Sequence, residues 1–93
     1  MVRGLLILSG EDPIEERTLA SLSDYQGAVG GWMQAIDLPD VGITIYVNEE
    51  GLLRQLPLNP RATFLWSYHQ AEARQQTMLV GNALDVGLPL ARA

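Results

Sequence analysis

The stretch of residues 21–36 constrains the fold most, because its large apolar residues recur at the spacing of an α-helix. They are Leu22, Tyr25, Val29, Trp32, Met33 and Ile36. Positions with this spacing share one stripe of a helix. Ser21 stands where an N-cap is expected, and Asp24 three residues later completes a capping-box pattern with negative charge in the first turn. The pattern predicts one main helix over residues 21–36.

Three glycines interrupt this predicted helix, at positions 27, 30 and 31. Each costs about 1 kcal/mol relative to alanine inside a helix, so such a helix needs packing to hold it. We expect Gly30 and Gly31 to face a sheet, where the helix backbone approaches it closely. Replacing Gly31 with leucine is then expected to overpack the contact and to destabilise the protein by about 1–3 kcal/mol.

Three strands are predicted around this helix. Residues 4–9 contain four consecutive apolar residues, which is typical of a strand covered on both faces. Residues 42–48 alternate apolar and polar side chains, so one face of that strand is buried. Residues 14–19 form a weaker candidate whose charges would protect the edge of a sheet.

The second half of the chain predicts a hairpin, a helix and a further strand. N-E-E-G at 48–51 is a turn that would join residues 42–48 to a strand at 52–56. Asn59 followed by Pro60 predicts a helix start, and that helix would end near Tyr68 or Arg74. Residues 77–80 and 83–86 predict a strand interrupted at Gly81. The fold class expected is therefore α+β, with a mostly antiparallel sheet of four to five strands packed against one main and one short helix.

Length and composition indicate a single domain, residues 1–93. The absence of cysteine excludes disulfides and thiolate metal sites. No apolar run reaches the length of a membrane span, so a cytoplasmic protein is expected. The net charge is -5 and all six basic residues are arginine. Nucleic-acid binding needs a basic surface that this chain lacks, so no nucleic-acid partner is expected.

Four segments resemble one known family. They are V-G-G-W-M-Q-A-I at 29–36, V-N-E-E-G at 47–51, L-P-L-N-P-R-A-T at 56–63 and V-G-N-A-L-D-V-G at 80–87. Their order and spacing are similar to those of an uncharacterised family of small single-domain proteins from bacteriophages and mobile elements. The resemblance implies a phage gene that acts in an infected cell, in host takeover, superinfection exclusion or counter-defence. It implies no reaction and no cofactor.

One candidate binding site lies at the predicted helix start, where Asn59, Arg61 and Thr63 cluster. Backbone N–H groups at a helix N-terminus can receive an anion, and one arginine beside them could grip a phosphate or carboxylate. Capping together with a surface ion pair explains the same residues without a ligand.

A second candidate is the acidic turn that contains Asn48 and Glu49. A metal site needs three or more converging oxygen ligands at a spacing that this turn lacks, so a solvated turn is expected and no metal is predicted. His69 is the only histidine. A catalytic triad also needs a nucleophile and an orienting acid, so we expect no catalytic residue.

Aromatic residues supply a third candidate surface. The main helix suffices for only one face of the sheet. Unless the short helix folds across the second face, some of Tyr46, Phe64, Trp66 and Tyr68 are expected to stay exposed. Exposed apolar patches usually mark an interface, and a homodimer buries the same patch on both copies. The leading hypothesis is a non-enzymatic protein that binds a host protein. The alternative is a protein that binds or sequesters a small anionic, nucleotide-like ligand.

Overall fold

The fold is built on a five-stranded antiparallel sheet. The computed structural model describes residues 2–38, 42–69 and 78–87. The elements in chain order are β1 (Val2–Ile7), β2 (Glu15–Leu19), α1 (Leu22–Val29), β3 (Met33–Leu38), β4 (Ile43–Asn48), α2 (Pro60–His69) and β5 (Ala83–Gly87). The strand order is β2-β1-β5-β4-β3, and every neighbouring pair is antiparallel. The α+β class expected from the sequence is confirmed.

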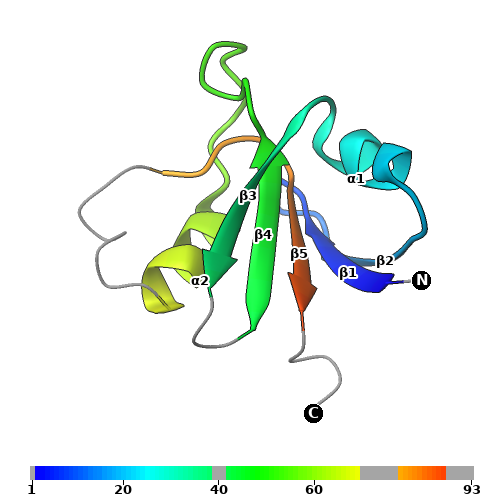
Figure 1. Ribbon diagram of the computed structural model, residues 1–93. Coiled ribbons are helices and arrows are strands. Elements are labelled where there is room, and N and C mark those ends of the chain that lie inside the picture. Colours follow the sequence, from blue (N-terminus) through cyan, green and yellow to red (C-terminus); the bar gives the residue numbers. More distant parts are fainter. Residues whose placement is uncertain (1, 39–41, 70–77, 88–93) are drawn as a thin grey trace.

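The sheet lies between the two helices, with α1 on one face and α2 on the other (Figure 1). Leu6 and Ile7 are adjacent in β1, yet Leu6 packs with Val29 of α1 while Ile7 packs with Ala62 of α2. Successive side chains of a strand point to opposite faces, so an unbroken apolar run serves both cores. The predicted double cover of residues 4–9 is therefore confirmed.

Residues 21–36 do not form one helix, and that prediction is wrong. The start is as expected, because the Asp24 carboxylate accepts hydrogen bonds from the backbone N–H groups of Ala20 and Ser21, at 2.7 and 3.2 Å. The helix ends at Gly30, which caps it in the left-handed conformation with φ 81°. Glycine adopts this conformation without the clash that a Cβ would cause.

The second half of that stretch forms β3 instead. All six residues of β3 pair with β4, from Met33 opposite Asn48 to Leu38 opposite Ile43. The free edge of β4 supplies ladder hydrogen bonds along this whole length, which a glycine-interrupted helix could not match. Gly30 and Gly31 therefore do not lie where a helix crosses a sheet. They form the turn from α1 into β3.

The predicted strand at residues 52–56 is also wrong, since residues 51–55 form consecutive turns. Backbone bonds link Arg54 to Glu50 and Leu56 to Gly51, at 2.9 and 3.0 Å. A strand has two edges, and those of β4 are taken by β3 and β5. No position beside β4 remains for another strand.

In the rest of the second half, the predicted helix start and late strand are confirmed, but the strand predicted at residues 77–80 is not formed in its described part, residues 78–80. Helix α2 begins at Pro60 as expected, while its possible extension to Arg74 lies outside the described residues, as does Thr77. Val80 forms only an isolated bridge with Leu58, and Gly81 has φ 77°. The segment after this break is β5, the central strand of the sheet. No helix in the described part of the chain has the length and apolarity needed to cross a membrane.

Candidate functional site

Asn59 is fully buried, and both polar atoms of its side chain form hydrogen bonds within the chain. Its Nδ2 donates to the carbonyls of Ile7 and Gly81, at 2.9 and 2.8 Å. Its Oδ1 accepts from the backbone N–H of Ala62 at 3.1 Å, which makes Asn59 the N-cap of α2. An asparagine amide has two N–H donors, and both are used here.

Thr63 and Arg61 make internal contacts of the same kind. The Thr63 hydroxyl donates to the Asn59 carbonyl and accepts from the Leu79 N–H, each at 2.8 Å. The Arg61 Nη2 donates to the carbonyls of Leu8 and Gly10, each at 2.9 Å, so it holds the connection that follows β1. Its Nε is buried and has no partner within the described residues.

A hollow of about 490 Å³ adjoins Arg61 and is also lined by Glu11 and Pro60. A carboxylate in the wall opposes the binding of an anion. The helix start of α2 faces its own cap, Asn59, and the guanidinium Nη2 is engaged with two carbonyls. The arrangement thus matches the structural explanation of Asn59, Arg61 and Thr63 that the sequence also allowed.

Asn48 joins β4 to the end of α1. It is buried, its Nδ2 donates to the Val29 carbonyl at 3.1 Å, and its Oδ1 accepts from the Glu50 N–H at 2.8 Å. A Cβ on Gly31 would come within 3.1 Å of that Nδ2. The side chain of Asn48 therefore links the end of α1, which precedes β3, to the turn that follows β4.

Glu49 follows Asn48 and is exposed. Its backbone N–H donates to the Trp32 carbonyl at 2.8 Å, which extends the β3–β4 ladder by one pair. No group of three or more His, Asp or Glu side chains that could hold a metal ion occurs within residues 2–38, 42–69 and 78–87.

Tyr46 lies on the α1 face of the sheet, opposite the face that Trp66 packs on. Its ring meets that of Tyr25 edge-on, with centroids 5.1 Å apart and planes at 74°. Burial raises the pKa of the Tyr46 hydroxyl, and the nearby Tyr25 and Asp37 raise it further. Tyr46 packs α1 onto the sheet.

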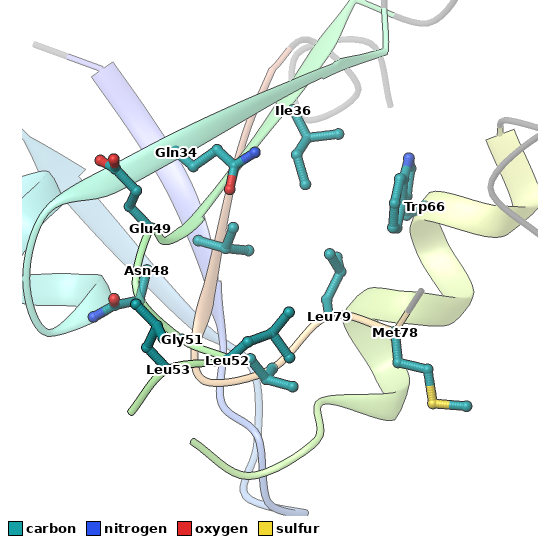
Figure 2. A pocket seen from close by; sticks show the side chains of 12 residues that line it. Gln34, Ile36, Asn48, Glu49, Gly51, Leu52, Leu53, Trp66, Met78 and Leu79 are labelled. Carbon is teal, nitrogen blue, oxygen red and sulfur yellow. The ribbon is translucent and has the colours of Figure 1, made fainter. Parts of the chain in front are cut away.

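Trp66 lies on the other face, in the wall of a groove of about 520 Å³ (Figure 2). This hollow, called here the β3 groove, is lined by Gln34 and Ile36 of β3, Glu49, Leu52 and Leu53 of the following turns, Trp66 of α2 and Met78, with the buried Val47 and Leu79 also in its wall. Figure 2 shows Trp66 and Met78 across the hollow from Glu49 and Gln34. Among the described residues, Glu49 is thus the one charged side chain in the wall of the β3 groove, across from the apolar Trp66 and Met78 (Figure 2).

The apolar side chains around the β3 groove are unusually exposed. Leu53 is 85% exposed, Leu52 70% and Met78 57%. The Nε1 of Trp66 is buried without a hydrogen-bond partner in the described part of the chain. Burying apolar side chains on folding is favourable by about 1.5–3 kcal/mol each, so adjacent exposed leucines mark a surface that gains by being covered.

The structure brings only two of the seven candidate residues, Glu49 and Trp66, into this groove with exposed surface; Asn48 lines it from a buried position. Sequence reasoning did not identify Gln34, Ile36, Leu52, Leu53 or Met78. Adjacent leucines between two turn sequences, E-E-G and Q-L-P, were the available signal for the exposed pair. The sequence pattern instead predicts a strand at residues 52–56, the second strand of a hairpin.

Comparison with known proteins identifies a family without assigning an activity. The family described as "Domain of unknown function (DUF3846)" matches residues 2–92. No curated protein and no solved structure matches the chain.

Proposed function

The chain belongs to the DUF3846 family, and from its geometry we propose that it is a non-enzymatic binding protein whose β3 groove engages another protein. The observation that carries this proposal is the exposed apolar rim of the groove, formed by Leu52, Leu53 and Met78 around Trp66. Tryptophan set in a ring of apolar residues is a common centre of binding energy in protein interfaces.

The resemblance of the four sequence segments to phage and mobile-element proteins supplies the setting of the proposal. The partner is then a host protein, met in the cytoplasm of an infected cell during host takeover, superinfection exclusion or counter-defence. Binding alone suffices for each of these roles, and the proposal includes no reaction and no cofactor.

The alternative, a small anionic ligand at the start of α2, receives no support from the contacts there. The side chains of Asn59 and Thr63 are bonded within the chain, and Glu11 lines the hollow beside Arg61. The two hollows have similar volumes, but the wall of the β3 groove contains Trp66 and the strongly exposed Leu52 and Leu53.

The test is capture of a partner from host lysate with two matched variants. Leu53→Glu places a charge on the rim of the β3 groove, and Leu22→Glu places the same charge on α1, across the sheet. Both leucines are exposed, so both variants should fold. We expect one host protein to bind wild type and Leu22→Glu but not Leu53→Glu, and calorimetry with the purified partner to reproduce that order. Equal capture by both variants, or no captured protein, would refute the proposal.

A further inference from the structure

The two edge strands of the sheet differ in how they are protected. In β2, Glu16 pairs with Arg3 of β1, and Arg17 pairs with Glu15 at 2.9 Å. Charged side chains of this kind discourage a further strand from pairing. The only charge in β3 is Asp37, whose carboxylate accepts a hydrogen bond from the Thr44 hydroxyl at 2.9 Å. The edge at β3 therefore lacks the protection that β2 has.

The ladder shows which groups of β3 face outward. The Glu49 N–H donates to the Trp32 carbonyl, so Trp32 and Glu49 form a hydrogen-bonded pair. Such pairs alternate along antiparallel strands. In the register of β3 and β4, the main-chain groups of Gln34, Ile36 and Leu38 therefore point to β4. Those of Met33, Ala35 and Asp37 point to the free edge, where no described strand pairs with them.

The free edge adjoins the β3 groove. Gln34 and Ile36 of β3 form one wall of that groove, and Trp32, directly before β3, is 67% exposed. A strand added beside β3 would direct every second side chain to the α2 face, over the groove and towards Trp66. Main-chain pairing and apolar pockets on one face together make the usual site for strand addition.

Acidic side chains line this edge, and the arginine near its start, Arg54, donates from its Nη1 to the Gly30 carbonyl at 3.0 Å. Glu49 lies in the groove wall, Asp37 lies in β3, and neither β3 nor the groove wall contains a lysine or arginine. The chain as a whole carries a net charge of -5. A second copy would bring the same acids to the contact, whereas a basic segment would be attracted to it.

We propose that the free edge of β3 and the β3 groove together bind an extended segment of the partner protein. The segment pairs with β3 as an additional strand, with apolar side chains over the groove and lysine or arginine on its other face. This inference rests on the proposed function and adds the conformation and chemistry of the partner.

The probe is the octapeptide acetyl-Val-Lys-Val-Lys-Val-Lys-Val-Lys-amide, with its Val-Glu counterpart as control. Both tryptophans of the chain, Trp32 and Trp66, lie at the proposed site, so their fluorescence reports on binding. We expect a saturable change at submillimolar Val-Lys peptide that weakens as salt is added, and none with Val-Glu. Equal responses to the two peptides, or none to either, would overturn the proposal.

Ala35→Pro tests the pairing itself. The Ala35 N–H points to the free edge, so proline removes no bond to β4 and is tolerated there, yet it blocks an added strand. Ala35→Val keeps the N–H and is the matched control. With both folds verified by circular dichroism, we expect at least about tenfold weaker peptide binding for Ala35→Pro only. Unchanged binding by Ala35→Pro would overturn the inference.

A second measurement leaves the protein unchanged. Methylating alternate peptide nitrogens of the Val-Lys octapeptide removes the donors along one of its edges, while the side chains stay the same. Two such peptides, each methylated on the opposite set, should differ at least about tenfold in affinity. Equal affinity of both for wild type would overturn strand pairing even if Ala35→Pro failed to fold.

The failures of the two proposals are distinguishable. A host protein that is lost with Leu53→Glu but kept by Ala35→Pro would sustain groove binding and overturn strand addition. Loss of neither would refute groove binding itself. A wild type that sediments as a dimer and becomes monomeric with Ala35→Pro would assign the edge to a second copy and overturn the partner proposed here.

Discussion

The side-chain amide of Asn59 donates a 2.9 Å hydrogen bond to the backbone carbonyl of Ile7, so the cap of α2 is also bonded to the end of β1. The same nitrogen donates to Gly81 at 2.8 Å, ahead of β5. One buried amide thus connects three segments that are far apart in the sequence. Removing it affects the helix start and the sheet together.

We therefore expect Asn59→Ala to lower the free energy of unfolding by about 2–4 kcal/mol, because two buried carbonyls lose their donor and α2 loses its cap. Asn59→Asp keeps the shape and the capping oxygen but faces a negative charge to the same carbonyls, so it should destabilise more at pH 7. Urea unfolding measures both. An Asn59→Asp protein as stable as wild type would contradict the assigned bonds.

Arg61→Ala should lower the free energy of unfolding by about 1–2 kcal/mol, because the Leu8 and Gly10 carbonyls lose their donor. Arg3→Ala is the matched control, since its exposed pair with Glu16 contributes about 0–1 kcal/mol. Below its melting temperature, Arg61→Ala should still capture the partner. A stable variant that no longer binds would instead make Arg61 a binding residue.

Two glycines in the predicted helix should respond oppositely to alanine. Gly30 has φ 81°, so Gly30→Ala should destabilise by about 1–2 kcal/mol. Gly27 lies within α1, and no neighbouring atom lies within 4 Å of the position that an alanine Cβ would take there. Gly27→Ala should therefore stabilise by up to about 1 kcal/mol. Thermal and urea unfolding give both values. Similar effects of the two substitutions would be inconsistent with a helix end at Gly30.

Stability should fall at high pH because of Tyr46. Burial raises the pKa of its hydroxyl above the ordinary value of 10.0, with Tyr25 and Asp37 adding to the rise. The folded state then holds the proton at a pH where the unfolded chain has released it. The stabilisation is complete below pH 10.0 and is lost as the pH rises through the folded-state pKa. Tyr46→Phe should flatten this loss, which urea unfolding at a series of pH values measures. An equally steep loss in Tyr46→Phe would contradict the prediction.

The homodimer predicted from exposed aromatic residues now has a candidate surface formed by Phe64 and Tyr68 of α2. Tyr46 is packed against Tyr25 under α1, whereas Phe64 and Tyr68 are exposed on α2 with ring centroids 6.1 Å apart. We expect wild type to sediment as a dimer at micromolar concentration and Phe64→Glu to dissociate at least about tenfold more readily. Leu22→Glu, on α1, is the control. A monomeric wild type would rule the dimer out.

Local patterns predicted several elements correctly. Each correct prediction describes only the surroundings of its own segment. The unbroken apolar run in β1 indicates burial on both faces, the alternation in β4 indicates a strand, the charges of β2 indicate a sheet edge, and Asn59–Pro60 indicates a helix start. Such preferences hold wherever the segment lies in the fold. These elements could therefore be predicted without knowledge of the strand order.

The candidate functional site was harder to predict from the sequence than these elements. Asn59 and Arg61 were recognised as a polar cluster, but their partners, Ile7, Leu8, Gly10 and Gly81, come from other parts of the chain. No local pattern distinguishes an asparagine that binds a ligand from one whose amide is used internally. The β3 groove is likewise made by four separate segments, and its leucines appear ordinary in sequence.

Spacing and capping act over a few residues, so local patterns predict the α+β class, the double cover of β1, the protected edge at β2 and both helix starts. The conformation of residues 29–36 depended instead on which strand they could pair with. Val29, Trp32, Met33 and Ile36 fit a helical stripe, and the glycine pair fits either a close helix crossing or a helix end. The free edge of β4 offered six pairing positions to Met33–Leu38, and that gain, absent from any local pattern, made the second half of the stretch a strand. The same pairing left β3 at the edge of the sheet, beside the groove.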